Sequence, residues 1–233
     1  GMYYSEKGEV LKKFNTKDGM AVELLLKNRI KTILMTKEKA EEYGVLFDTV
    51  SYTGYESLLN EAKIDAVYIP LPNSIHAKWI EEALSRDIHV LVEKSMACSY
   101  EEVKYLNKIA SNKRLVLLEN FQFRFHNQLA VIRDLLNEGK IGELRCMRSS
   151  FGFPPFPDAN NIRYNKELGG GALFDAGAYP LKVAQIFLGQ NIEGTSAYLY
   201  FDKVRDIDIW GGAYLRHSNG PAFAQVAFGF DNH

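Results

Sequence analysis

A lysine, an aspartate and a tyrosine form the set of side chains in this sequence that is best suited to moving protons. Lys94 follows Glu93 directly after the apolar run His89–Val92, and Asp175 and Tyr179 stand four residues apart. A lysine at a strand end can orient a substrate hydroxyl, and a phenol near a lysine can act as an acid or a base. The pattern therefore predicts Lys94, Asp175 and Tyr179 as a catalytic group.

Each of these side chains also has an ordinary structural interpretation. Lys94, taken alone, reads as a surface lysine in an ion pair with Glu93. Asp175 could cap a helix on which Tyr179 packs, since residues four apart share a helix face. For the aspartate and the tyrosine, the residue types leave both interpretations open.

The segment that positions Lys94, Ile64–Met96, reads as strand, loop, helix and strand. An apolar run at Asp65–Ile69 is ended by Pro70 and Pro72, because proline cannot donate to a β-ladder. A helix with apolar residues at helical spacing follows, and His89–Val92 is the second buried strand. The segment predicts a βαβ unit, and open α/β sheets bind ligands beyond the carboxyl ends of their strands.

Polar residues of the connecting loop are candidates for binding at that edge. Asn73 and His76 lie between the first strand and the helix, and Glu93 lies after the second strand. Alternatively, Asn73 or Ser74 caps the helix, and His76 is a helix-start residue bonded to a nearby carbonyl.

The rest of the chain divides into two patterns. Ser99, with Glu102 as capping-box partner, begins another helix, and Leu115–Glu119 is the next strand, so residues 1–122 predict a doubly wound parallel sheet. From Glu143 the pattern is mostly antiparallel, with a Gly-rich helical insert, which predicts an α+β domain over residues 123–233. The expected segments are Leu144–Phe153, Gly169–Leu188, Gly194–Tyr200, Asp208–Arg216 and Ala222–Phe230.

Five spaced motifs resemble the glucose–fructose oxidoreductase / inositol dehydrogenase (Gfo/Idh/MocA) family from about Lys39 onward. They are IPLPNSIH, HVLVEKS, ENFQFRFHNQ, GKIGEL and GGGALFDAGAYPL. The resemblance implies a Rossmann-like domain followed by a substrate and oligomerisation domain, and an NAD(P)-dependent oxidoreductase acting on a carbinol of a sugar or cyclic polyol. Ser95 replaces the proline of the family's Glu-Lys-Pro motif, which is expected to loosen the turn.

The resemblance also implies which residues bind the NAD or NADP cofactor and the substrate. The cofactor residues expected are Thr36, Lys37, Pro70, Leu71, Asn73, His76, Glu93, Lys94 and Arg124, and the substrate residues are Arg163 and Tyr164. A cation at Lys37 would suit the 2′-phosphate of NADP, and a solvated loop is the alternative. No metal site is expected.

Residues 1–38 are atypical for such a domain. They read as a hairpin around Lys7-Gly8, a helix and a strand at Ile30–Met35, but the turn at Asn15–Met20 lacks the G-x-G-x-x-G that lets backbone approach a pyrophosphate. Cofactor binding is therefore expected to be weak or absent, and a non-catalytic remnant of the fold is the alternative function. This stretch also resembles part of a haloacid-dehalogenase-like sugar phosphatase, whose DxD motif it lacks.

The composition suits a soluble protein that acts on a small molecule. The chain has 233 residues, 46% of them hydrophobic and 24% charged, with a net charge of −1, so no nucleic-acid or membrane partner is expected. Cys98 and Cys146 form no disulfide framework, which favours the cytoplasm. We expect both domains to be incomplete, the second ending in mid-sheet at His233, with an exposed edge that favours a homo-oligomer such as a dimer.

Overall fold

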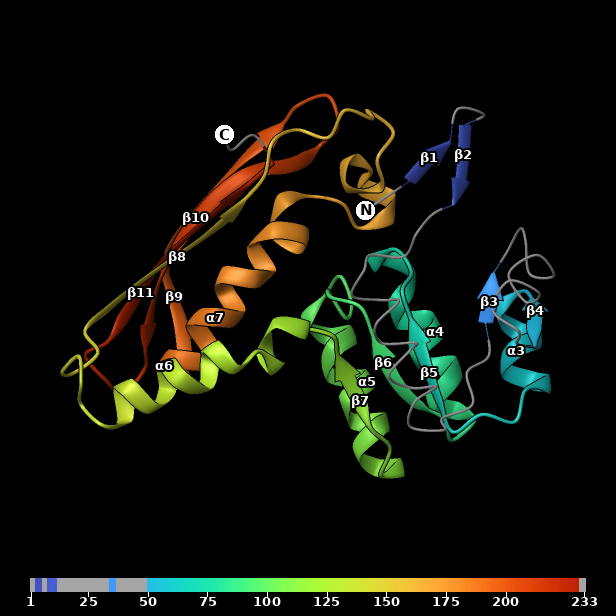
Figure 1. The fold of residues 1–233 in the computed structure, drawn as a ribbon, viewed down its shortest axis with the longest axis horizontal. Coiled ribbons are helices and arrows are strands. Elements are labelled where there is room, and N and C mark those ends of the chain that lie inside the picture. The colour runs from blue at the N-terminus through green and yellow to red at the C-terminus, as the bar shows by residue number, and fades with distance from the viewer. Residues whose placement is uncertain (1–2, 6–7, 12–33, 37–49, 231–233) are drawn as a thin grey trace. The chain divides into compact units, whose positions relative to one another are not determined.

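A computed structural model describes residues 3–5, 8–11, 34–36 and 50–230, which fall into two compact units, residues 1–63 and 64–233 (Figure 1). In the first unit, β1 (Tyr3–Ser5) and β2 (Gly8–Leu11) pair antiparallel, which confirms the predicted hairpin. The strand β3 (Leu34–Thr36) pairs in parallel with β4 (Ser51–Thr53), and α3 (Tyr55–Glu61) follows. The turn at residues 15–20, the helix expected before residue 30 and Lys37 itself lie outside the described residues.

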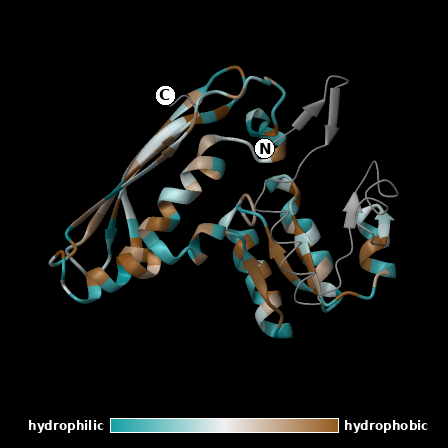
Figure 2. Ribbon diagram, in the orientation of Figure 1, coloured by the Kyte–Doolittle hydropathy of each residue, from teal (hydrophilic) through white to brown (hydrophobic). Residues whose placement is uncertain are grey.

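The second unit opens with a three-stranded parallel sheet in the order β5-β6-β7. Its strands are β5 (Ala66–Ile69), β6 (His89–Val92) and β7 (Leu117–Glu119), joined by α4 (Asn73–Ser85) and α5 (Tyr100–Lys113). The strands are mostly apolar, and the helices are mixed (Figure 2). Ile80, Ala83 and Leu84 of α4 are fully buried, and α4 packs on β5 and β6, so the predicted parallel sheet is confirmed.

The two predicted helix caps have different outcomes. The Ser99 hydroxyl accepts the backbone N–H of Glu102 at 3.2 Å and donates to its carboxylate at 3.0 Å, which confirms the cap of α5. The N-cap residue of α4 is Pro72, and no side chain caps this helix. The predicted cap by Asn73 or Ser74 is wrong, since both lie within α4 and the side chain of Asn73 binds elsewhere.

The second sheet has the strand order β8-β11-β10-β9. Its strands are β8 (Cys146–Gly152), β9 (Ile192–Asp202), β10 (Ile207–His217) and β11 (Phe223–Gly229). The strand β10 is antiparallel to both neighbours, and β8 is parallel to β11. A Rossmann-like sheet followed by a mostly antiparallel mixed sheet is therefore confirmed, and the domain boundary at residues 122 and 123 stays a prediction.

Helical segments between β7 and β8, and between β8 and β9 of the second sheet, carry several candidate residues. They are η1 (Gln122–Phe125), α6 (Asn127–Asn137), η2 (Ile162–Tyr164), η3 (Lys166–Leu168), the π-helical turn η4 (Leu173–Gly177) and α7 (Ala178–Leu188). The helix α7 packs on β8, β10 and β11, and η4 packs on β10 and β11. The insert therefore covers one face of the second sheet.

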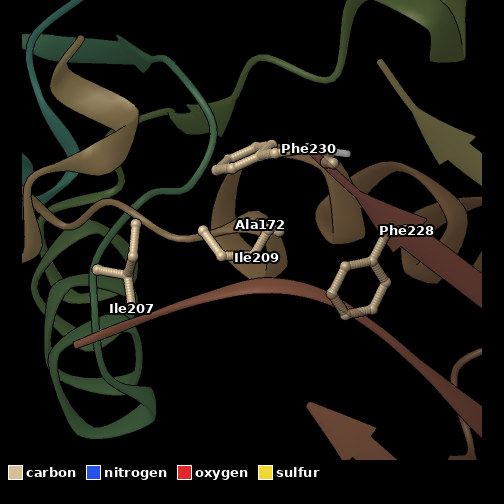
Figure 3. Packing of buried hydrophobic residues seen from close by; sticks show 6 residues of the cluster. Ala172, Ile207, Ile209, Phe228 and Phe230 are labelled. Atoms are coloured by element: carbon tan, nitrogen blue, oxygen red, sulfur yellow. The ribbon is translucent and has the colours of Figure 1, made fainter. Parts of the chain in front are cut away.

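The core of the second sheet lies beneath this insert. One cluster joins Ala172 and Ala176 of the insert to side chains of β10 and the end of β11, among them Phe228 and Phe230 (Figure 3). A second cluster joins Ala184 and Leu188 of α7 to the same sheet. Ala224, Val226, Phe228 and Phe230, on one side of residues 222–230, are thus buried. In the described part of the chain, no helix is long and apolar enough to cross a membrane.

Candidate active site

Lys94 extends from the carboxyl end of β6 to the π-helical turn η4. Its Nζ donates to Oδ1 of Asp175 at 2.7 Å and to the backbone oxygen of Asp175 at 2.8 Å. The two side chains are only 11% and 15% exposed. The structure thus brings Lys94 and Asp175 into direct contact, so that Lys94 pairs with Asp175 and not with the neighbouring Glu93.

The second oxygen of Asp175 binds another cation. Arg163 donates from Nε to Oδ2 at 2.7 Å, and its guanidinium carbon lies 5.0 Å from the centre of the Phe156 ring. One carboxylate thus holds Lys94 and Arg163 in fixed directions, and the group of three keeps a net positive charge. Arg163, expected to contact substrate, is placed at the same site.

Tyr179 is the second residue of α7 and packs in an aromatic cluster. Its ring centre lies 6.2, 5.9 and 4.8 Å from those of Phe121, Phe123 and Phe151, and Nζ of Lys94 lies 5.0 Å from it. Burial raises the pKa of the phenol, the nearby carboxylates raise it further, and Arg163 opposes them. The phenol therefore keeps its proton at neutral pH.

The Tyr179 hydroxyl is not used by this packing. Among the described residues, no side chain or backbone group is hydrogen-bonded to it. Both interpretations drawn from the sequence thus fit the tyrosine, because its ring packs while its hydroxyl remains available for a substrate oxygen.

Asn73 connects the start of α4 to both halves of the site. Its amide nitrogen donates to the backbone oxygen of Gly169 at 2.9 Å, and its amide oxygen accepts the N–H of Ser95 at 3.1 Å. Gly169 has φ +74, and a Cβ there would lie 2.8 Å from Cβ of Asn73. The Ser95 hydroxyl also donates to the oxygen of Phe174 at 3.3 Å. The turn after Lys94 is thus held by two hydrogen bonds of Ser95, and the loosening expected from the missing proline stays a prediction.

His76 is fully buried below this turn. Its Nδ1 lies 2.7 Å from the backbone oxygen of Ser95, and its Nε2 lies 2.7 Å from that of Leu71. The ring therefore joins the loop after β5 to the turn after β6, as in the structural interpretation of this residue. This geometry favours a positioning role over direct contact with a cofactor.

Glu93 presents one carboxylate oxygen to the edge of the parallel sheet. Its Oε1 accepts the hydroxyl of Tyr68 at 2.5 Å and the amide of Asn120 at 2.7 Å. These bonds fix the carboxylate, and in the described part of the chain Oε2 accepts no hydrogen bond. Such an oxygen, with Pro70 and Leu71 on the same edge, fits a ribose hydroxyl or a carboxamide.

The remaining candidates are more scattered. Thr36 ends β3 in the first unit. Arg124 is exposed in η1. The pKa of Lys182 is lowered mainly by the burial of that lysine and further by the charge of Arg124. The hydroxyl of Tyr164 accepts the N–H of Phe156 at 2.9 Å, which fits a structural role better than substrate contact. No group of metal-ligating side chains occurs among the residues described.

Sequence reasoning missed three groups of residues that shape this site. They are the ring cluster around Tyr179, the partners of Glu93, and Asp208 on β10, whose carboxylate binds the start of η4. The run FQFRF was a visible signal for part of the ring cluster. The other contacts join residues 25 or more apart, and no local spacing indicates them.

Two family models match most of the chain. Residues 9–121 match a model described as an oxidoreductase family with an NAD-binding Rossmann fold, and residues 129–232 match the GFO/IDH/MocA C-terminal domain. The first match includes most of residues 1–38, and nothing supports the resemblance of that stretch to a phosphatase. NAD or NADP is confirmed as the cofactor class.

Curated relatives and solved structures agree with these matches. The chain is 42% identical over 195 residues to dTDP-3,4-didehydro-2,6-dideoxy-alpha-D-glucose 3-reductase of Saccharopolyspora spinosa, which covers 84% of this chain and 58% of that protein. It is 33% identical over 194 residues to D-xylose 1-dehydrogenase (NADP(+)) 2 of Haloferax volcanii, covering 82% and 57%.

A 3-ketoreductase from Actinomadura kijaniata, solved with NADP and TDP-benzene, has a TM-score of 0.80 and 37% identity to this chain, covering 86% of this chain and 62% of that one. The chain therefore spans less than two thirds of the length of these relatives. The two sheets and the Lys94–Asp175 pair at their junction agree with the two family matches. The chain belongs to the GFO/IDH/MocA family of oxidoreductases.

Proposed function

We propose that this chain carries the catalytic site of an NAD(P)-dependent oxidoreductase acting at a carbinol carbon of a sugar or cyclic polyol. The observation that carries the proposal is the Lys94–Asp175 pair, which lies beside the hydroxyl-bearing Tyr179 at the carboxyl end of a parallel sheet. The names of the relatives, 3-reductases of a dTDP-sugar and a xylose dehydrogenase, favour a sugar or sugar nucleotide over a polyol.

The residues of this chain handle the proton of the reaction. The nicotinamide cofactor, when bound, supplies or accepts the hydride. In the direction of ketone reduction, the Tyr179 hydroxyl donates its proton to the carbonyl oxygen as negative charge develops there. The ammonium of Lys94 stabilises that charge, because a fixed cation in a partly buried site needs no reorganisation during the reaction.

Asp175 and Arg163 act by holding Lys94. The carboxylate accepts one N–H from each cation, so the ammonium is fixed and retains a free proton for the substrate. Lys94 is the alternative proton donor, since its Nζ lies 5.0 Å from the centre of the Tyr179 ring. We propose a small-molecule substrate and a cytoplasmic location, the two cysteines being free and exposed.

We expect weak cofactor binding, measured by fluorescence titration with NADH and NADPH. Each charge-assisted hydrogen bond lost with the glycine fingerprint costs about 1.5–3 kcal/mol, so several losses move micromolar affinity toward the millimolar range. Glu93→Gln is expected to weaken both cofactors alike, because its carboxylate faces the part they share. Lys37→Met is expected to weaken NADPH alone.

Sub-micromolar binding of either cofactor by the unaltered chain would contradict this prediction. If Lys37→Met leaves the ratio of the two affinities unchanged, Lys37 belongs to a solvated loop. No binding of either cofactor at millimolar concentration would support the non-catalytic alternative, which the missing glycine fingerprint favours.

We also propose that the chain forms homo-oligomers through the outer face of its second sheet. Tyr198 and Trp210 are 60% and 41% exposed, and the Tyr200 and Trp210 rings stack with centres 5.2 Å apart. Because side chains alternate along a strand, these rings lie opposite the face covered by α7. Exposed aromatic patches of this kind mark association surfaces.

Trp210→Glu is accordingly expected to shift the chain toward a monomer in sedimentation velocity. Val204→Glu, at an exposed turn beside the same strands, is the matched control and is expected to leave the distribution unchanged. A purely monomeric wild-type chain at high concentration is the result that this proposal excludes.

A further inference from the structure

Asp208 is a buried carboxylate that lies beneath the catalytic segment. Asp208 is 8% exposed and belongs to β10, one of the strands that the helical insert covers. Its neighbours Ile207 and Ile209 are also buried, and the register between β10 and β9 shifts between Asp208 and Trp210. Such an irregularity re-aims a side chain, which explains how three consecutive strand residues are buried.

The carboxylate of Asp208 binds the start of the turn that carries Asp175. Its Oδ2 accepts the backbone N–H of Leu173 at 2.6 Å, where η4 begins. Burial raises the pKa of Asp208, while hydrogen bonds from the backbone of Leu173 and Ala172 oppose that shift. The first N–H groups of a helix have no intrahelical partner, and a carboxylate there both satisfies them and complements the helix dipole.

Gly171 makes room for this contact. It has φ +114, and a Cβ added there would overlap Oδ1 of Asp208. Its backbone oxygen accepts the N–H of Asp175 at 3.2 Å, so Gly171 also forms the first bond of the turn. Gly171, the third glycine of GGGAL, and Asp208, on a strand distant in sequence, thus both contact the segment that carries Asp175.

The position of Asp175 matters because Lys94 makes two hydrogen bonds to this residue. The ammonium of Lys94 binds both the side chain and the backbone oxygen of Asp175, so a shift of the turn moves both acceptors together. Ala172 and Ala176 fix the turn against the sheet only by apolar contact, which has no direction. The hydrogen bond from Leu173 to Asp208 adds a directional contact at the start of the turn.

We propose that Asp208 is a positioning residue, whose carboxylate fixes the start of η4 so that Asp175 holds Lys94 in its working orientation. The proposal rests on the proposed function for its activity readout, and it also has a structural readout that is independent of turnover. No contact of Asp208 with substrate or cofactor is implied.

The activity test compares Asp208→Ala, Asp208→Asn and Gly171→Ala with the wild-type chain. Asp208→Ala is expected to lower kcat by about 100-fold, the usual cost of misplacing a catalytic group by about 1 Å, with the cofactor Kd unchanged. Asp208→Asn is expected to recover part of the rate, because its amide oxygen can still accept the N–H of Leu173. Gly171→Ala is expected to resemble Asp208→Ala.

Matched controls separate positioning from general loss of stability. Asp202→Asn alters another carboxylate that accepts backbone N–H groups, those of Val204 and Arg205 in the turn between β9 and β10, away from η4 in sequence. Gly139→Ala alters another glycine at positive φ, with nothing within 4 Å of the added Cβ. Both are expected to keep the wild-type kcat. If Asp208→Ala lowers the melting temperature while the folded fraction keeps its kcat, Asp208 is only structural and the proposal is overturned.

The independent readout is chemical labelling of Lys94 by an amine-reactive reagent, followed by mass spectrometry. In the wild-type chain Lys94 is ion-paired and 11% exposed, so slow labelling is expected. Asp208→Ala is expected to label Lys94 faster, while Lys113 is labelled at the same rate in both. Faster labelling in a chain without any turnover would uphold the positioning role and reject the proposed function. Unchanged labelling of Lys94 would reject the positioning role whatever the turnover.

Discussion

Lys94→Met is expected to abolish measurable turnover of a keto sugar with NADPH. The substitution removes both the fixed positive charge and the proton that the site offers to a substrate oxygen. General acid–base groups contribute about 100- to 10,000-fold to a rate, and electrostatic stabilisation of the developing charge adds to this. Methionine keeps most of the side-chain length, so steady-state kinetics would report the loss of the ammonium itself.

The stability of the Lys94→Met chain is expected to change little. Asp175 keeps its bond to Arg163, so the substitution leaves no carboxylate without a cation. Lys113→Met is the matched control, since it removes an ion-paired lysine at the protein surface, where it binds Asp87. Wild-type turnover in Lys94→Met would show that the lysine is structural and would overturn the proposed mechanism.

Tyr179→Phe is expected to reduce the rate by roughly 100-fold or more, the scale of a lost general acid. Phenylalanine preserves the ring contacts with Phe121, Phe123 and Phe151, so the substitution removes the hydroxyl and little else. Cofactor binding, measured by fluorescence, is expected to be unchanged, because Tyr179 belongs to α7 and not to the parallel sheet.

The control for this substitution is Tyr105→Phe, which removes a hydroxyl bonded to Glu81 on the surface of α5. It is expected to keep the wild-type rate. Should Tyr179→Phe retain the full rate and only lower the melting temperature, the tyrosine is a packing residue. Proton transfer would then fall to Lys94.

The pH dependence of ketone reduction is a second test of Tyr179 as the proton donor. Burial raises the pKa of this phenol from its ordinary value of 10.0, so the protonated donor persists through the neutral range. The rate is expected to fall only when the pH rises beyond 10, as the phenol loses its proton. In Tyr179→Phe the part of this alkaline decline that belongs to the phenol is expected to be absent, which a pH profile of kcat would detect.

The sequence was sufficient to predict the elements that bear the site. The βαβ unit of residues 64–96 is confirmed because its apolar runs, prolines and helical spacing are all local signals. The sequence also predicted that Lys94 and Asp175 belong to one catalytic group, but it did not predict the ion pair between them. The bond between them depends on how the helical insert crosses the end of the parallel sheet, which the spacing of residues does not indicate.

Long-range partners explain most of what the sequence did not predict. Asn73 looks like a helix cap by type and position, but Gly169 and Ser95 offer its amide better partners than the helix does. The parallel pairing of β8 with β11 was missed for a similar reason. An alternating strand pattern indicates a half-buried strand and carries no information about the direction of its neighbour.

Transfer of deuterium from NADPH labelled at the reactive carbon of the nicotinamide tests the central claim most directly. The chain would be incubated with this cofactor and a keto sugar nucleotide, beside Lys94→Met, and the product analysed by mass spectrometry. We predict that the wild-type chain places the label on the new carbinol carbon and that Lys94→Met does not. Unlabelled product from the wild-type chain, or equal labelling by Lys94→Met, would contradict the account.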